Sequence, residues 1–250
     1  MGTWVELGVA NWTCVICGSI NIAAPAVREG MLCAQCHSTW RVRATALGVL
    51  QGMGCPHVPF PEVHPNWAWK GAGISDHMAL SAAFSTKFDY TNTYYHRFPR
   101  LDLLNITEDQ RRFFGFVVCS DVLEHVPPPA DLALQGIADL LADHGFAILS
   151  VPSGGVENPT DEYYPDLIDW EELDGRVTWT DSSGNTHVDD DPEFHGGGGQ
   201  TLAFRLWAMG DFCTRVVAAG FKAIAQVPTN DELGVPALEN SGVFIAYPDR

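Results

Sequence analysis

Basic residues are scarce in this 250-residue chain. Lysine and arginine together number 14 against 31 aspartates and glutamates, which gives a net charge of −17. A charge of this sign repels phosphate backbones and anionic lipid surfaces. We therefore expect neither a nucleic acid nor a membrane among the partners of this protein.

Long apolar runs are missing as well. No stretch reaches the roughly 18 uncharged apolar residues that a membrane span needs. The N-terminal sequence MGTWVELGVANWT lacks the basic start and apolar middle of a secretory signal. A cytoplasmic location is therefore the expectation, and the 46% hydrophobic content is enough to form a full core.

Cysteines are few, but four of the seven are paired along the chain, as Cys14 with Cys17 and Cys33 with Cys36. The spacing C-x2-C, fifteen residues, C-x2-C is typical of a structural zinc site with four thiolates. We predict a zinc ribbon over residues 11–40. Two redox pairs are the alternative, but a redox C-x-x-C normally opens a helix in a thioredoxin-like unit. A closed four-cysteine site leaves no open position for a substrate, so its predicted role is stability or docking.

The residues after the second cysteine pair place apolar side chains at helical intervals, with Arg41 and Arg43 on the polar side. This pattern predicts a helix that joins the ribbon to the rest of the chain. We therefore expect a first unit over residues 1–55 and a second over residues 56–250.

The second unit alternates strand and helix patterns, which indicates an α/β fold: a doubly wound, mostly parallel sheet with helices on both faces. The last two strands favour an antiparallel C-terminal edge. The expected elements are a strand running into Gly71 and Gly73, a helix near 77–87, strands at 88–95 and 114–121, a helix at 130–142, a strand at 145–152, a helix at 207–219, and strands in FKAIAQV and SGVFIAYP.

The segment VVCSDVLEHVPPP is an apolar strand that ends in ionisable residues, Asp121, Glu124 and His125. In open α/β sheets, ligands bind outside the carboxyl ends of the strands. The segment therefore predicts that these side chains lie at the mouth of a ligand crevice.

An acidic insertion is expected at about residues 157–195, because thirteen acidic residues stand against one basic residue between Glu157 and Glu193. His195 closes this stretch and precedes four glycines, a composition typical of a mobile flap. With Tyr163 and Tyr164, it forms a second candidate substrate-side group. The alternative is an ordinary loop histidine and two packing tyrosines.

The order of the segments GAGISD, RLDLLN, FVVCSDVLEHVPPP and LLADHGFAILSVP resembles class I S-adenosylmethionine-dependent methyltransferases. The resemblance covers roughly residues 66–250 and implies a Rossmann-like fold. More narrowly, YTNTYYH, DEYYPDLIDW and PEFHGG are similar to a bacterial subgroup that often carries a cysteine-rich N-terminal segment.

The resemblance also implies a set of cofactor-binding residues. Gly71 and Gly73 would make room for the methionine part of S-adenosylmethionine. Asp102 and Leu103 would lie beside its adenine, and Asp121 would close the pocket toward the substrate.

The implied activity is methylation of oxygen or nitrogen on a small molecule, such as a sugar or a secondary metabolite. His125 is the first candidate for the base that removes the acceptor's proton, because the pKa of imidazole lies near neutrality. His195 is the second candidate. The alternative is that His125 braces the following loop and contacts no substrate.

Three other interpretations of the sequence remain open. The segment DVLEH also resembles the E-x-x-E-H metal site of some quinone O-methyltransferases, which would place an ion at Asp121, Glu124 and His125. The same fold and cofactor can instead serve cyclisation or elimination. Finally, Trp69 and Lys70 stand where the family usually has an acid, which favours a non-catalytic scaffold with the ribbon as its docking surface. Whichever interpretation holds, the candidate partners besides a small molecule are a second copy of the chain or a protein bound through the ribbon.

Overall fold

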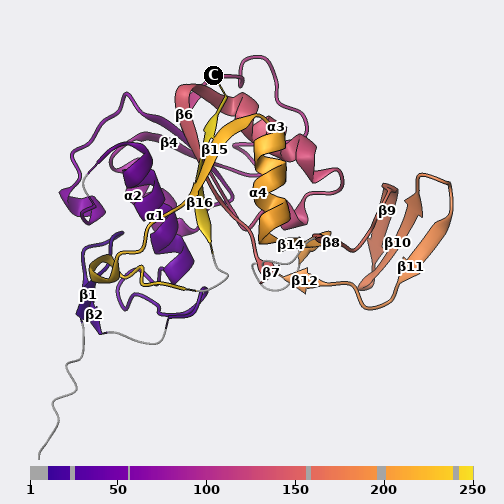
Figure 1. Ribbon diagram of the computed structural model, residues 1–250, viewed down its shortest axis with the longest axis horizontal. Coiled ribbons are helices and arrows are strands. Elements are labelled where there is room, and N and C mark those ends of the chain that lie inside the picture. Colours follow the sequence, from indigo (N-terminus) through magenta and orange to yellow (C-terminus); the bar gives the residue numbers. More distant parts are fainter. Residues whose placement is uncertain are drawn as a thin grey trace, which may run out of the picture.

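A six-stranded sheet with helices on both faces forms the centre of the protein (Figure 1). The structure, a computed structural model, describes residues 11–22, 26–55, 57–155, 159–195, 201–238 and 242–249. The four glycines at 196–199, which the sequence analysis assigns to a mobile flap, lie outside these residues. No helix in the described ranges combines the length and the apolar character that crossing a bilayer requires.

The sheet has the order β15-β16-β6-β5-β3-β4, and its first four strands along the chain are parallel. The predicted mostly parallel sheet is therefore present. β16 runs antiparallel to both of its neighbours, β15 and β6, so the reversed strand lies second from the edge. The six strands are β3 (Lys70–Ile74), β4 (Asp89–Thr93), β5 (Phe114–Ser120), β6 (Leu141–Ser150), β15 (Phe221–Gln226) and β16 (Val243–Pro248).

Two helices cover each face of the sheet (Figure 1). On one face, α1 and α2 pack on alternate sheet side chains such as Phe116 and Phe146. On the other face, α3 and α4 pack on the intervening ones, such as Val117 and Ala147. This alternation is the period-two pattern of a strand buried on both sides. The helices are α1 (Trp40–Gly52), α2 (Met78–Ser85), α3 (Ala130–Leu140) and α4 (Met209–Ala218).

Two helix boundaries differ from the sequence expectation. The helix expected to reach residue 142 ends at Leu140, because Leu141 pairs with Phe114 in the sheet. The helix expected from Trp207 begins at Met209, because Trp207 pairs with Ser153 in a short parallel ladder. In both cases tertiary pairing overrides the local helix pattern.

The cysteine-rich segment packs directly against the sheet domain. Its hairpin, β1 (Asn11–Thr13) and β2 (Ile20–Ile22), flanks the first cysteine pair. The Trp12 ring lies 4.2 Å from the guanidinium of Arg43, and a side chain at Gly234 would collide with that ring. One apolar core contains residues of this segment, of α1 and of the sheet. A division into units at residue 55 stays a prediction.

The acidic insertion forms a separate three-stranded antiparallel sheet that projects from the rest of the molecule (Figure 1). Its strands are β9 (Leu167–Leu173), β10 (Arg176–Asp181) and β11 (Thr186–Asp189). Short strands and 3₁₀ helices make the remaining connections: η1 (Phe60–Glu62), η2 (Leu123–His125), β7 (Ser153–Gly155), β8 (Asp161–Glu162), β12 (Phe194–His195), β13 (Thr201–Leu202), β14 (Arg205–Ala208) and η3 (Asp231–Leu233).

Candidate functional site

A cavity lies at the switch point of the sheet. The chain leaves β3 for β4 on one side, whereas β5 lies on the other side of β3, and ligands of open α/β sheets bind at such a point. The cavity has a volume of about 600 Å³. Its walls come from the chain just after β3 and β5, from the cysteine-rich segment and α1, and from β12. The polar and ionisable residues of the wall, with one proline, include Ser75, Asp76 and His77 after β3; Ser120, Asp121, Glu124 and His125 at the end of β5 and after it; Arg28, Glu29 and Arg41; and Pro152 and His195.

The 3₁₀ helix η2 is held in place by residues 202–205, which we call the strap. Arg205 donates from Nη1 to the carbonyls of Leu123 and Val126, at 2.6 and 2.7 Å. The Phe204 amide donates to the Glu124 carbonyl at 2.8 Å. Arg205 is itself buried and paired with Glu162. The strap thus fixes the backbone that carries Glu124 and His125.

The two histidines that the sequence singled out, His125 and His195, lie side by side. His125 Nδ1 is 2.8 Å from the Leu202 carbonyl, so the neutral ring donates there and leaves the Nε2 lone pair free. β12 pairs with β13, and this pairing places the His195 ring centroid 4.6 Å from that of His125. Burial lowers the pKa of His125, against the opposing effect of the Leu202 carbonyl.

Glu124 is buried in the cavity wall, with 1% of its side chain exposed. Neither carboxylate oxygen has a hydrogen-bond partner among the described residues. Its Oε1 lies 3.7 Å from His125 Nε2. Burial, with the nearby charge of Asp121, raises the pKa of Glu124 to about 8.

Asp121 also lines the cavity, and two arginines from the N-terminal part of the chain hold it. Arg28 binds it through two hydrogen bonds, at 2.6 and 2.5 Å, and Arg41 Nε lies 2.9 Å away. Ser150 also donates to it. Burial alone would raise the pKa of Asp121, but the hydrogen bonds of Arg28 and the charge of Arg41 lower it overall.

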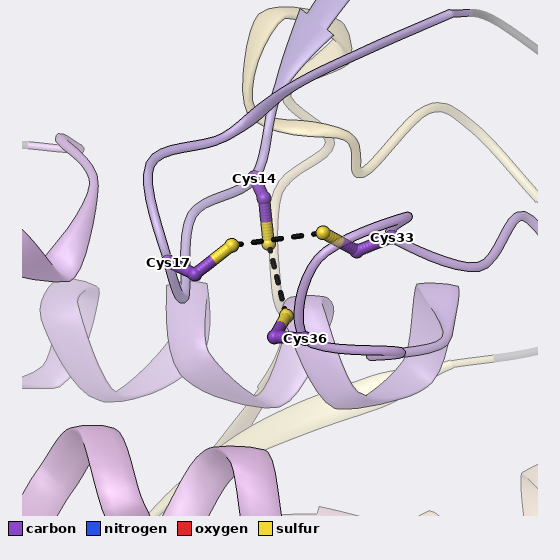
Figure 2. Close-up of side chains that lie close together, drawn as sticks. All are labelled: Cys14, Cys17, Cys33 and Cys36. Carbon is purple, nitrogen blue, oxygen red and sulfur yellow. Dashed lines mark hydrogen bonds between the residues drawn. The ribbon is translucent and has the colours of Figure 1, made fainter.

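The four predicted cysteines converge on one point (Figure 2). Cys14 Sγ lies 3.6 Å from Cys36 Sγ, and Cys17 Sγ lies 3.6 Å from Cys33 Sγ. A tetrahedral zinc ion with Zn–S bonds of about 2.3 Å holds its sulfurs roughly 3.8 Å apart, so the donor set fits that ion. Each pair sits on a tight turn, in which the amide of Gly18 or His37 donates back to the first cysteine.

Gly71 and Gly73 lie inside β3 rather than in a loop beyond it. A Cβ atom at Gly71 would come within 2.2 Å of the Phe116 ring, and one at Gly73 within 2.1 Å of the Tyr90 hydroxyl. Both glycines therefore leave room for aromatic side chains of the core. A contact with a cofactor stays a prediction for both.

Neither Asp102 nor Leu103 is among the described residues that line the main cavity. Asp102 accepts hydrogen bonds from the Leu104 amide and the Asn105 side chain, and it lines a second hollow of about 290 Å³. Leu103 is buried, and its carbonyl closely approaches Gly136 of α3. The hollow and the cavity share no described lining residue, and an adenine contact for Asp102 and Leu103 stays a prediction.

Tyr163 and Tyr164 belong to a small apolar cluster that joins the acidic insertion to Leu202 and Phe204 of the strap. The Tyr164 hydroxyl donates to Asp189 at 2.9 Å, and its ring packs on Phe204. Neither tyrosine is among the described residues that line the cavity. Their described contacts serve packing, and a catalytic role stays a prediction.

Sequence reasoning missed the two arginines of the cavity wall and the buried acid Asp76. The Asp76 carboxylate accepts a hydrogen bond from Tyr90, and burial raises its pKa to about 7. Asp76 follows the end of β3 just as Asp121 follows β5, so the same end-of-strand rule could have found it. Arg28 carries no such signal, because its partner is 93 positions away.

Comparison with known proteins gives structural likenesses only. No family model matches the chain, and no curated protein matches it. Among solved structures, it is similar to a sugar N-methyltransferase from Streptoalloteichus sp., with 12% identity, 93% of this chain and 100% of that chain covered, and a TM-score of 0.49.

Two further solved structures are similar to the chain at comparably low identity and TM-score. A glycopeptide N-methyltransferase complexed with sinefungin has 15% identity, a TM-score of 0.48, and coverage of 90% of this chain and 100% of that one. An S-adenosylmethionine-dependent methyltransferase from Clostridium acetobutylicum has 10% identity, a TM-score of 0.47, and coverage of 84% and 91%. At TM-scores below 0.5, these likenesses establish neither an activity nor a ligand for this chain.

Proposed function

We propose that this protein is an S-adenosylmethionine-dependent methyltransferase that acts on a small molecule. The observation that carries the proposal is the cavity of about 600 Å³ at the carboxyl ends of β3 and β5. Its volume is in the range of small-molecule sites. The family resemblance of the strand-end segments supports the same reading.

The polar groups of the cavity suit the amino-acid part of the cofactor, which carries an ammonium and a carboxylate. Asp76 Oδ1 and Arg28 Nε are both buried and have no hydrogen-bond partner among the described residues. One is an acceptor and the other a donor, so they complement the two charged groups. When bound, the cofactor supplies a methyl group on a positively charged sulfur.

The chain's own residues must align the acceptor with that methyl group and remove a proton when the acceptor is a hydroxyl. His125 is suited to accept the proton, because its Nδ1–H is committed to the Leu202 carbonyl and its Nε2 remains free. His195 lies next to it. Glu124 lines the adjoining wall, where Asp121 is already paired with Arg28 and Arg41.

The four-cysteine cluster serves this site indirectly. We propose that it binds structural zinc and thereby orders the segment that carries Arg28, while α1 carries Arg41. Ile20 and Ile22 of the same segment are 74% and 70% exposed. A protein partner or a second copy that covers them stays a prediction.

The test is calorimetric titration of the zinc-loaded protein with S-adenosylmethionine and S-adenosylhomocysteine. We expect micromolar binding of both, followed by formation of S-adenosylhomocysteine when small-molecule acceptors are supplied. Asp76→Asn should weaken binding of both ligands, whereas the exposed His64→Gln serves as the control. Absence of binding by either ligand at millimolar concentration would refute the proposal. Binding with turnover but without S-adenosylhomocysteine release would point to a cyclisation or an elimination.

A further inference from the structure

Three metal-ligating side chains from two distant segments meet at the cavity. Glu124 and His125 come from η2, and His195 comes from β12. One ligand atom of each lies within 4.8 Å of the other two. We propose that Glu124, His125 and His195 form a binding site for a divalent transition-metal ion such as Zn²⁺, in addition to the four-cysteine site.

A cation beside Glu124 would satisfy its buried carboxylate. A buried carboxylate without hydrogen bonds is costly, so it must take up a proton or pair with a positive charge. The two arginines of the cavity wall are already engaged: Arg28 with Asp121, and Arg41 with Asp121 and Glu29. The two arginine charges are thus paired with Asp121 and Glu29, and no described ion pair joins either arginine to the Glu124 carboxylate.

The two imidazoles are arranged as metal ligands usually are. A ligating histidine normally donates its other ring N–H to a carbonyl or carboxylate, which fixes the tautomer. His125 Nδ1 has this contact with the Leu202 carbonyl at 2.8 Å, so its Nε2 is available to an ion. That carbonyl belongs to the strap, and β13 also pairs with the strand of His195. One structural unit therefore orients both rings.

The donor set defines the class of ion. Two imidazoles with one carboxylate suit zinc and other first-row divalent metals, and three protein ligands leave at least one coordination position open. An ion about 2.1 Å from His125 Nε2 and Glu124 Oε1 would hold these atoms roughly 3.4 Å apart in tetrahedral geometry. They are 3.7 Å apart in the structure, so only a small approach is required.

This ligand set differs from the one that the segment DVLEH suggests by resemblance. In that pattern the first acid, Asp121, would be a ligand together with Glu124 and His125. Here Asp121 is occupied by Arg28 and Arg41. His195, seventy positions after His125, takes the third place.

The role of the ion, unlike its binding, rests on the proposed function. A cation with an open position lowers the pKa of a bound hydroxyl. The acceptor hydroxyl would then lose its proton to solvent, and its oxygen would form the new bond to the methyl carbon while the carbon–sulfur bond breaks. S-adenosylhomocysteine and the methylated product result. In this arrangement His125 and His195 are ligands rather than bases.

The experiment is a cobalt titration of the full chain with its four-cysteine site filled with zinc. Weakly held metal is first removed by dialysis against a mild chelator, and Co²⁺ is then added under visible absorption. We expect one further equivalent of Co²⁺ with d–d bands and without sulfur-to-cobalt charge transfer. Charge-transfer bands would show replacement of the cysteine-bound zinc instead and would count against the site.

Two variants make the assignment specific. Glu124→Gln keeps the shape of the side chain and removes its charge, and His195→Gln removes the ligand that lies outside η2. Each should weaken cobalt binding by about 100-fold or more, since even loss of a supporting contact costs 10- to 100-fold. His64→Gln, on an exposed loop, is the control and should bind as wild type does. Zinc content and melting temperature verify that each variant folds.

The outcomes separate this inference from the proposed function. No cobalt beyond the cysteine site, or unchanged cobalt affinity in both folded variants, would overturn the metal site. Calorimetry with S-adenosylmethionine on the same samples tests the other claim. Cobalt binding without cofactor binding would keep the metal site and remove the methyltransferase proposal, and the reverse result would do the opposite.

Discussion

The chain holds two clusters of metal-ligating side chains that arise in different ways. The four cysteines lie within residues 14–36, on two turns of the same short segment. The second cluster comes from two distant segments: Glu124 and His125 precede the acidic insertion, and His195 closes it. The first cluster is determined by local spacing, whereas the second exists only when the strap is in place. A local cluster can help its segment to fold, but an assembled cluster depends on a fold that other contacts stabilise.

The largest effect is expected where the local cluster is broken. Cys33→Ser removes a fully buried ligand from a segment that shares its core with the sheet. Because structural zinc contributes directly to folding free energy, we expect a loss of roughly 5 kcal/mol or more. Thermal melting and zinc analysis measure it. Cys213→Ser, outside the cluster, should change stability by no more than about 1 kcal/mol. A zinc-free Cys33→Ser protein that melts like wild type would show that the cluster is not structural.

The assembled cluster is best broken through the strap. Arg205→Met leaves the carbonyls of Leu123 and Val126 and the carboxylate of Glu162 without their buried partner. Removing one member of a buried ion pair costs about 3–5 kcal/mol. We expect this loss in denaturant unfolding, together with loss of cobalt binding at the assembled cluster while zinc stays on the cysteines.

Arg176→Met is the matched control for the strap. Arg176 pairs with Asp190 on the exposed insertion, where such a pair contributes less than about 1 kcal/mol. Equal destabilisation by the two substitutions would mean that the strap has no special role. Retained cobalt binding in Arg205→Met would mean that η2 keeps its place without the strap.

Asp76 is a third buried acid of the cavity wall. Unlike Glu124, it has a hydrogen-bond partner in the fold, the Tyr90 hydroxyl. Burial raises the pKa of Asp76 from 3.8 to about 7. Between these values the native state retains a proton that the unfolded state has lost, so stability falls as the pH rises from about 4 to about 7. The expected decrease is roughly 2–4 kcal/mol, at about 1.4 kcal/mol per pKa unit. The difference in unfolding free energy between wild type and Asp76→Asn across this range isolates the effect, and parallel pH profiles would contradict it.

The smallest effect is expected at the contact between the cysteine-rich segment and the cavity. Arg28→Met removes the two-bond contact with Asp121 but leaves Arg41 and Ser150 in place. We expect about tenfold weaker binding of S-adenosylmethionine, equal to about 1.4 kcal/mol, and little change in melting temperature. Titration calorimetry measures this loss. Arg111→Met, at an exposed pair with Asp139, is the control, and an affinity equal to that of wild type in Arg28→Met would separate the segment from the site.

The features that the sequence predicts correctly depend on short-range patterns. The cysteine spacing predicts the four-sulfur cluster, and the alternation of strand and helix patterns predicts the mostly parallel sheet. The end-of-strand rule places Asp121, Glu124 and His125 at the cavity, as the structure does. Each of these inferences uses a pattern only a few residues to a few tens of residues long.

Long-range contacts account for what the sequence does not predict. Nothing in the local sequence around Arg28 indicates a partner near residue 121, and nothing around Glu124 indicates that its carboxylate is left without a hydrogen bond. The proximity of His195 to His125 depends on the pairing of β12 with β13 and on the strap contact with η2. Trp207 fits a helix pattern but is placed in a strand by its pairing with Ser153.

The contact of Arg28 and Arg41 with Asp121 has a practical consequence for protein engineering. A shortened chain that began after α1 would lose one wall of the cavity, and the sheet face beneath that helix, with Phe146 and Ile148, would be exposed to solvent. Such a fragment would aggregate through that apolar face. Transplanting this cavity into another protein would therefore require the cysteine-rich segment and α1 to be moved together with the sheet.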